Sequence, residues 1–136
     1  MVCEIQKTPQ TPQTTTNTEI SFSGVGLHSG KKSTVVIKPS ELDTGINFVR
    51  TDVNNNNQIK AIWYNVTSTV LSTTISNKDH ISVSTIEHLM SALFGMHIDN
   101  ANILINGPEI PIMDGSSRPF VELFEQAGIS TQNAHR

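Results

Sequence analysis

The sequence predicts an α+β fold in which a mainly antiparallel sheet carries two helices on one face. Short runs rich in β-branched residues, each bounded by Gly, Pro, Asn or Asp, fill the first half of the chain and are typical of strands. Two segments of the second half place apolar residues at helical spacing. Because strands and helices separated in this way form two layers, we expect the helices to pack together on one side of the sheet.

Length and composition indicate one globular domain. The chain has 136 residues, 36% of them hydrophobic and 15% charged, which fits a folded protein with a polar but largely uncharged surface. A net charge of -3 and nine scattered Lys and Arg residues argue against a nucleic-acid binder, whose affinity comes from clustered basic residues. Cys3 is the only cysteine, so any metal must be held by His or carboxylate ligands.

The first 18 residues are expected to form a disordered tail ahead of a domain at 19–136. This tail consists mainly of Thr, Gln and Pro, and it has too few apolar side chains to offset the entropy lost on ordering. No apolar run approaches the roughly 18 to 20 residues of a membrane helix. The N-terminus also lacks the pattern of a secretory signal. We therefore expect a cytoplasmic protein without a transmembrane segment.

Five strands are expected before the first helix. The predicted strands are residues 20–22, 33–37, 46–49, 59–63 and 70–75. Between the first two, Gly24, Gly26 and Gly30 frame a structured turn, because glycine permits positive φ angles and a close approach of the backbone.

The first helix is expected to begin at Ser84, which would form a capping box with Glu87, and to end near Gly95. Its buried stripe would consist of Ile86, Leu89, Met90 and Leu93. A strand at 101–105 and a polar loop at 106–117 follow. The second helix is expected to start near Pro119 and to stop at Gly128, and its apolar residues are Phe120, Leu123 and Phe124.

Glu87 and His88 are the most informative pair of polar residues. His88 projects almost opposite to the buried stripe of its helix, so it is not a core histidine. A histidine in such a position is usually solvated, and composition alone favours a capping role for Glu87. No second His stands four residues away, as a zincin motif would require. A catalytic zinc usually has three protein ligands, so two would come from elsewhere.

Two further residues are candidates for supporting a site. His28 lies between two glycines of its turn, where it would either approach a ligand or bond within its own loop. Asp114, in Met-Asp-Gly-Ser, would either face a site or form a turn by accepting backbone N–H groups. The remaining internal histidines, His80 and His97, are expected at the surface.

Five motifs, taken together and in order, resemble the LpxC family of UDP-3-O-acyl-N-acetylglucosamine deacetylases. They are GVGLHSGK at 24–31, TGI with RTD at 44–52, STIEHL at 84–89, IDN at 98–100 and PEIPIMDGS at 108–116. The resemblance covers about residues 20–128. It implies two similar α+β domains with the helices sandwiched between two sheets, of which this chain would be the first half.

The resemblance also implies a site and a reaction. His88 matches a zinc ligand and Glu87 a general base, for hydrolysis of the N-acetyl group of UDP-3-O-(3-hydroxyacyl)-N-acetylglucosamine to acetate and free amine in lipid A biosynthesis. The other two Zn²⁺ ligands would come from a His-x-x-x-Asp pair in the second domain, which is absent here. His28 and Asp114 match recurrent residues of the family and are assigned only supporting roles.

The missing half leaves two interpretations of this chain. It is either one part of a working deacetylase, inactive until its C-terminal catalytic domain is present, or a catalytically inactive binding or regulatory module derived from the enzyme. In both cases the helical face that the second domain would cover is expected to promote self-association.

Overall fold

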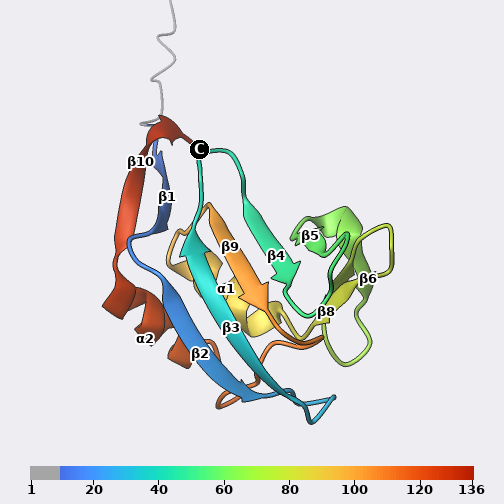
Figure 1. Cartoon of the computed structure of the whole chain (residues 1–136). Coiled ribbons are helices and arrows are strands. Elements are labelled where there is room, and N and C mark those ends of the chain that lie inside the picture. Colours follow the sequence, from blue (N-terminus) through green and yellow to red (C-terminus); the bar gives the residue numbers. More distant parts are fainter. Residues whose placement is uncertain (1–9) are drawn as a thin grey trace, which may run out of the picture.

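The computed structural model describes residues 10–136, and these residues form an α+β fold built around a five-stranded sheet (Figure 1). The order of its strands is β2-β3-β9-β4-β5. Their bounds are β2 Ile20–Val25, β3 Lys32–Pro39, β4 Ile46–Arg50, β5 Gln58–Lys60 and β9 Ala101–Ile105. Every neighbouring pair is antiparallel except β4 and β9, which run parallel. The predicted mainly antiparallel sheet is therefore confirmed.

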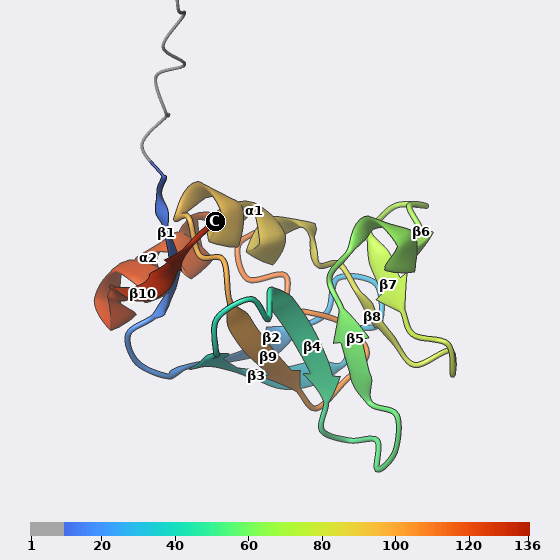
Figure 2. The same cartoon turned by 90° about the horizontal axis from the view of Figure 1, so that it is seen from above.

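Two helices, α1 (Glu87–Gly95) and α2 (Arg118–Ala127), lie on the same side of this sheet (Figure 2). The rings of Phe22 in β2 and Phe120 in α2 pack with centroids 5.3 Å apart. Gly128 ends α2 with a φ angle of 78° and donates its N–H to the carbonyl of Phe124. The predicted arrangement of both helices on one face is confirmed, as are the bounds of the second helix to within one residue.

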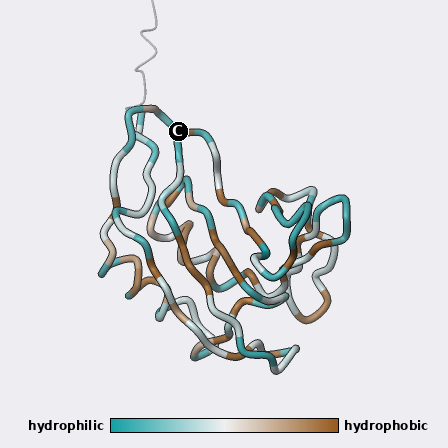
Figure 3. Tube along the Cα trace, in the orientation of Figure 1, coloured by the Kyte–Doolittle hydropathy of each residue, from teal (hydrophilic) through white to brown (hydrophobic). Residues whose placement is uncertain are grey.

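The core lies between the sheet and the helices. The strands alternate between inward, mainly apolar residues and outward residues of mixed polarity. The inward apolar side chains of β3, β4, β5 and β9 are at most 1% exposed, and those of β2 at most 8%. The principal members are Val35, Ile37, Phe48, Ile59, Ile103 and Ile105 from the sheet and Leu89, Leu93, Phe120 and Phe124 from the helices. Hydrophobic segments accordingly follow the central strands and both helices in Figure 3.

A second, three-stranded sheet lies beside the edge strand β5. It consists of β6 (Val66–Ser68), β7 (Thr74–Ser76) and β8 (Ser82–Ser84), and a 3-10 turn at Trp63–Asn65 leads into it. The predicted strand at 59–63 is therefore too long, and only the end of the predicted strand at 70–75 is correct. The tip between β6 and β7 is exposed, with Leu71 86% accessible in a left-handed conformation, so its apolar residues have no sheet to pack on.

The expected disordered tail is wrong for the part that the structure describes. β1 (Pro12–Thr16) pairs antiparallel with β10 (Ile129–His135), and residues 13–16 are buried although they are polar. The pairing partner lies more than a hundred residues away, so a local measure of hydrophobicity does not reveal it. Residues 1–9 lie outside the described part of the chain.

The start of the first helix also differs from the prediction. Ser84 is the last residue of β8, and α1 begins at Glu87 without a side-chain cap. The hydroxyl of Ser84 donates to the carbonyl of Pro108 instead, at 3.3 Å. The expected capping box is therefore wrong, because a tertiary partner takes the hydroxyl that the motif would assign to the helix.

Candidate functional site

Glu87 occupies the first turn of α1, where its side chain is half-buried and has a specific partner. The backbone N–H of Thr73, just before β7, donates to its Oε2 at 3.1 Å. The carbonyl of Thr73 in turn accepts the N–H of Ile86 at 3.3 Å. The carboxylate of Glu87 is thus held against the small sheet, and Oε1 remains available for another contact.

His88 follows on the same turn and is also half-buried. The residues of α1 that are fully buried are Leu89, Ala92 and Leu93, so His88 lies off the core side of the helix, as predicted. Within residues 10–136, no three His, Cys, Asp or Glu side chains are grouped closely enough to hold a metal ion.

The glycine-framed turn is held by Glu109, a residue that sequence reasoning did not select. Its carboxylate is 2% exposed and accepts the backbone N–H of His28 at 2.8 Å and of Ser29 at 3.0 Å. The side chain of His28 itself is exposed. Glu109 thus fixes the backbone of His28, and neither alternative for its side chain, contact with a ligand or a bond within its own loop, is tested by this contact.

We expect Gly26→Ala to lower the free energy of unfolding by about 2 kcal/mol, which is typical of overpacking. A Cβ atom at this position would lie 2.7 Å from Cδ of Glu109, whose carboxylate is fixed by two N–H groups. Urea denaturation of the chain followed by circular dichroism measures the change. Gly95→Ala is the matched control, because nothing lies within 4 Å of the added atom, and equal stability of the two variants would contradict the prediction.

Asp114 forms a turn within the loop that precedes α2. Its Oδ1 accepts the N–H of Ser116 at 2.9 Å and the hydroxyl of Ser116 at 2.7 Å. These donors stabilise the charged form and hold the pKa of the Asp114 carboxyl below its ordinary value. The exposed carboxylate therefore forms the turn that was one of the two alternatives for Asp114, and its role at a site is not tested.

The segment 108–112 connects the glycine-framed turn with the start of α1. Ser84 pairs with this segment on both its N–H and its carbonyl, three residues before Glu87. Ile112 donates its N–H to the carbonyl of Val25, next to the turn that holds His28. No hydrogen bond within residues 10–136 joins His28 or Asp114 directly to the Glu87–His88 pair.

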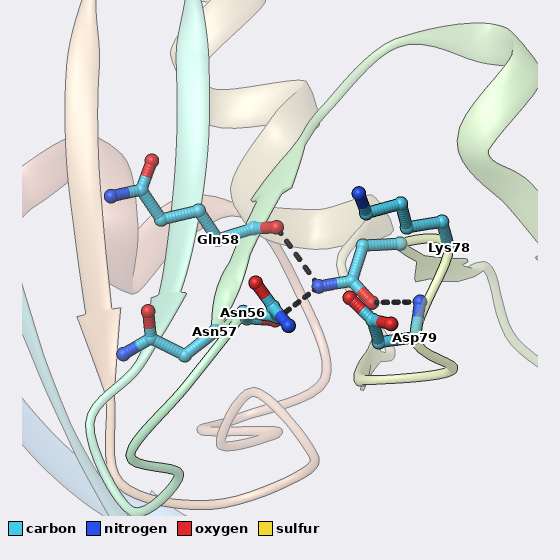
Figure 4. A pocket seen from close by; sticks show the side chains of 6 residues that line it. Asn56, Asn57, Gln58, Lys78 and Asp79 are labelled. Atoms are coloured by element: carbon cyan, nitrogen blue, oxygen red, sulfur yellow. Dashed lines mark hydrogen bonds between the residues drawn. The ribbon is translucent and has the colours of Figure 1, made fainter.

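A polar cavity of about 330 Å³ lies apart from these residues, between the β4–β5 loop and the β7–β8 turn (Figure 4). The side-chain amide of Asn77 joins the two segments that line this cavity. Its Nδ2 donates to the carbonyls of Asn56 and Gln58 on the β4–β5 side. Its Oδ1 accepts the N–H groups of Asp79 and Ile81 on the β7–β8 side. These bonds hold the turn between β7 and β8, in which His80 is exposed as expected. The cavity is a structural junction and shares no residue with the candidate site.

Comparison with known proteins identifies the family. The profile of the LpxC family, described as UDP-3-O-acyl N-acetylglycosamine deacetylase, matches residues 13–136. The chain belongs to the LpxC family. The match includes β10 and all of β1 except Pro12, and both strands lie outside the motifs at 24–116 that first indicated the resemblance.

Curated LpxC relatives are about half identical to this chain. A UDP-3-O-acyl-N-acetylglucosamine deacetylase of Geotalea uraniireducens is 51% identical over 124 residues, which is 91% of this chain and 40% of the relative. The enzyme of the same name from Shewanella pealeana is 49% identical over 122 residues, which is 90% of this chain and 40% of the relative. The chain thus spans about 40% of the length of the LpxC deacetylases that it matches.

Some expectations about this LpxC-family chain stay predictions. In the described part of the chain, no helix is long and apolar enough to cross a membrane, and the cytoplasmic location is not tested further. Phe94 is 84% exposed on α1, and self-association through the helical face is not tested. The supporting roles of His28 and Asp114 in a site are likewise untested.

Proposed function

We propose that this chain supplies the general base and one zinc ligand of an LpxC deacetylase. The reaction would be hydrolysis of the N-acetyl group of UDP-3-O-(3-hydroxyacyl)-N-acetylglucosamine, with release of acetate, in lipid A biosynthesis. The observation that carries the proposal is the placing of Glu87 and His88 side by side on the first turn of α1, off the core side, in a chain of this family.

The donor set of the chain fits part of a zinc site. His88 offers an imidazole beside a carboxylate, and a catalytic zinc needs two further protein ligands, which the remaining part of the full-length enzyme would provide. When bound, zinc would polarise the acetyl carbonyl and lower the pKa of water.

Glu87 accepts the proton of the attacking water in this proposal. A general base must keep a free lone pair within hydrogen-bond reach of that water. The N–H of Thr73 holds Oε2 and so restricts the rotation of the carboxylate, while Oε1 is left for the proton. A carboxylate that is already oriented loses less entropy in the transition state than a freely rotating one.

The proposal predicts that His88→Ala removes most of the zinc from a complete enzyme. Such an enzyme is obtained by joining this chain to the remaining region of the Geotalea uraniireducens relative, and its zinc content is measured by mass spectrometry of the metal. We expect about one zinc ion per chain before the substitution, because a catalytic site of this type holds a single ion.

His97→Ala is the matched control, because His97 is an exposed histidine just beyond the end of α1. This variant should keep its zinc and its deacetylase activity. Full zinc content and full turnover in His88→Ala would refute the assignment of His88. Turnover by the 136-residue chain without the added region would refute the division of the site between two parts.

A further inference from the structure

Thr85 combines two unfavourable features two residues before Glu87. Its φ angle is 56°, in the left-handed region that β-branched residues rarely adopt. Its side chain is 1% exposed, and in the described structure its hydroxyl Oγ1 has no hydrogen-bond partner. Strain and unpaired buried groups of this kind persist only where the surrounding structure enforces them, and they cluster at functional sites.

The backbone on both sides of Thr85 is fixed. On one side, Ser84 donates its N–H to the carbonyl of Pro108 at 2.9 Å and accepts the N–H of Ile110 at 3.1 Å. On the other side, Ile86 donates its N–H to the carbonyl of Thr73 at 3.3 Å. The chain must therefore change from strand β8 to helix α1 within the two residues Thr85 and Ile86. Ile86 already has helical backbone angles, so the left-handed conformation of Thr85 makes the change of direction.

The direction of this turn decides where Glu87 lies. Thr73 accepts a hydrogen bond from the residue before Glu87 and donates one to the Glu87 carboxylate at 3.1 Å. If the first turn of α1 rotated about residue 85, the carboxylate of Glu87 would move away from the N–H of Thr73. His88 would move together with Glu87, because both residues lie in the first turn of the helix.

We propose that Thr85 is a positioning residue for Glu87 and His88. Its buried, β-branched side chain restricts the turn between β8 and α1 to one direction. A glycine at residue 85 would adopt the same φ angle without strain, but it would also adopt many others, so the first turn of α1 would be less firmly oriented. The inference rests on the proposed function of Glu87 and His88 and specifies how the fold orients their side chains.

The test is the amide resonance of Thr73 in nitrogen-15 spectra of the 136-residue chain. Glu87→Ala, which removes the acceptor of this bond, provides the reference position of a released amide. We expect Thr85→Gly to move the Thr73 resonance most of the way to that position and to raise its hydrogen exchange roughly tenfold, the equivalent of losing one hydrogen bond. Thr85→Val keeps the branched shape and should restore the wild-type resonance.

His80→Gly is the matched control, since His80 also has a φ angle of 60° but lies in an exposed turn. It should leave the Thr73 resonance unchanged. An unchanged Thr73 resonance in a folded Thr85→Gly variant would overturn the proposal. A displaced Thr73 resonance in Thr85→Val would also overturn it, because the hydroxyl of Thr85, and not its branched shape, would then position Glu87.

If Thr85→Gly does not fold, Thr85→Ser decides the question, because it removes only one methyl group. A partial displacement of the Thr73 resonance supports the positioning role, and an unchanged resonance overturns it. The measurement needs neither zinc nor substrate. A result that contradicts the role of Thr85 therefore does not contradict the proposed zinc and base roles of His88 and Glu87. Conversely, an unchanged zinc content in His88→Ala does not contradict the structural role of Thr85.

Discussion

Glu87→Gln is expected to lower the kcat of the completed two-domain enzyme by about 10² to 10⁴-fold, the usual contribution of a general base. Glutamine has nearly the same shape and can still accept the N–H of Thr73, but it cannot take a proton from water. The change should therefore affect turnover and leave the fold and the zinc content intact. Release of acetate from the UDP-linked acylated amino sugar measures the turnover.

Glu125→Gln is a suitable control for this experiment. Glu125 is an exposed carboxylate on α2, the other helix of the same layer, so its neutralisation removes the same charge at a different place. Turnover of Glu125→Gln should equal that of the unmodified enzyme. If Glu87→Gln turned over at that rate too, Glu87 would not be the base, and its structural bond to Thr73 would be its only function.

Asn100→Ala is expected to lower the free energy of unfolding by about 3 kcal/mol, because three hydrogen bonds of a buried amide are lost together. Asn100 is 2% exposed. Its Nδ2 donates to Oε1 of Gln13 at 2.9 Å and of Gln132 at 2.8 Å, and its Oδ1 accepts the N–H of Gly45 at 2.8 Å. This amide joins β1, β10 and the loop before β4 to the start of β9.

Urea unfolding of the 136-residue chain measures this loss. Asn102→Ala is the matched control, because Asn102 lies two residues further along, on the outward side of β9, and is only half-buried. Its replacement should change the stability by less than about 0.5 kcal/mol. Similar stabilities of the two variants would show that β1 and β10 are held by backbone pairing alone and that the amide network adds nothing.

The accuracy of the predicted fold depends on where each segment finds its partners. The strand at 101–105 and the helix that ends at Gly128 were predicted correctly, because each carries its own periodicity and end signals. β1 was missed because its polar residues are satisfied by Asn100 and by β10, far along the chain. Ser84, the last residue of β8, was assigned to the start of the helix because Ser84 and Glu87 fit a capping box, which a bond to Pro108 replaces.

In the candidate site, too, local features were predicted from the sequence and features that depend on distant partners were not. The pairing of Glu87 with His88 and its place off the core side of a helix were predicted from the sequence, because neighbours in sequence on one helical turn are neighbours in space. Thr73, Thr85 and Glu109 were not selected. Thr73 and Glu109 form hydrogen bonds with segments distant in the sequence, and Thr85 has an unusual backbone φ angle. Neither the types of these residues nor their spacing in the sequence indicates such features.

The α+β class, the family resemblance and the two residues proposed for chemistry follow from the amino-acid sequence, because they depend on local patterns and on the order of motifs. The contacts that hold those two residues in place are visible only in the folded chain. Thr73 orients Glu87, Thr85 turns the chain into α1, and Glu109 fixes the backbone of His28. The physical reason is that a hydrogen bond between distant segments exists only after the chain has folded and brought a donor and an acceptor to within about 3 Å of each other.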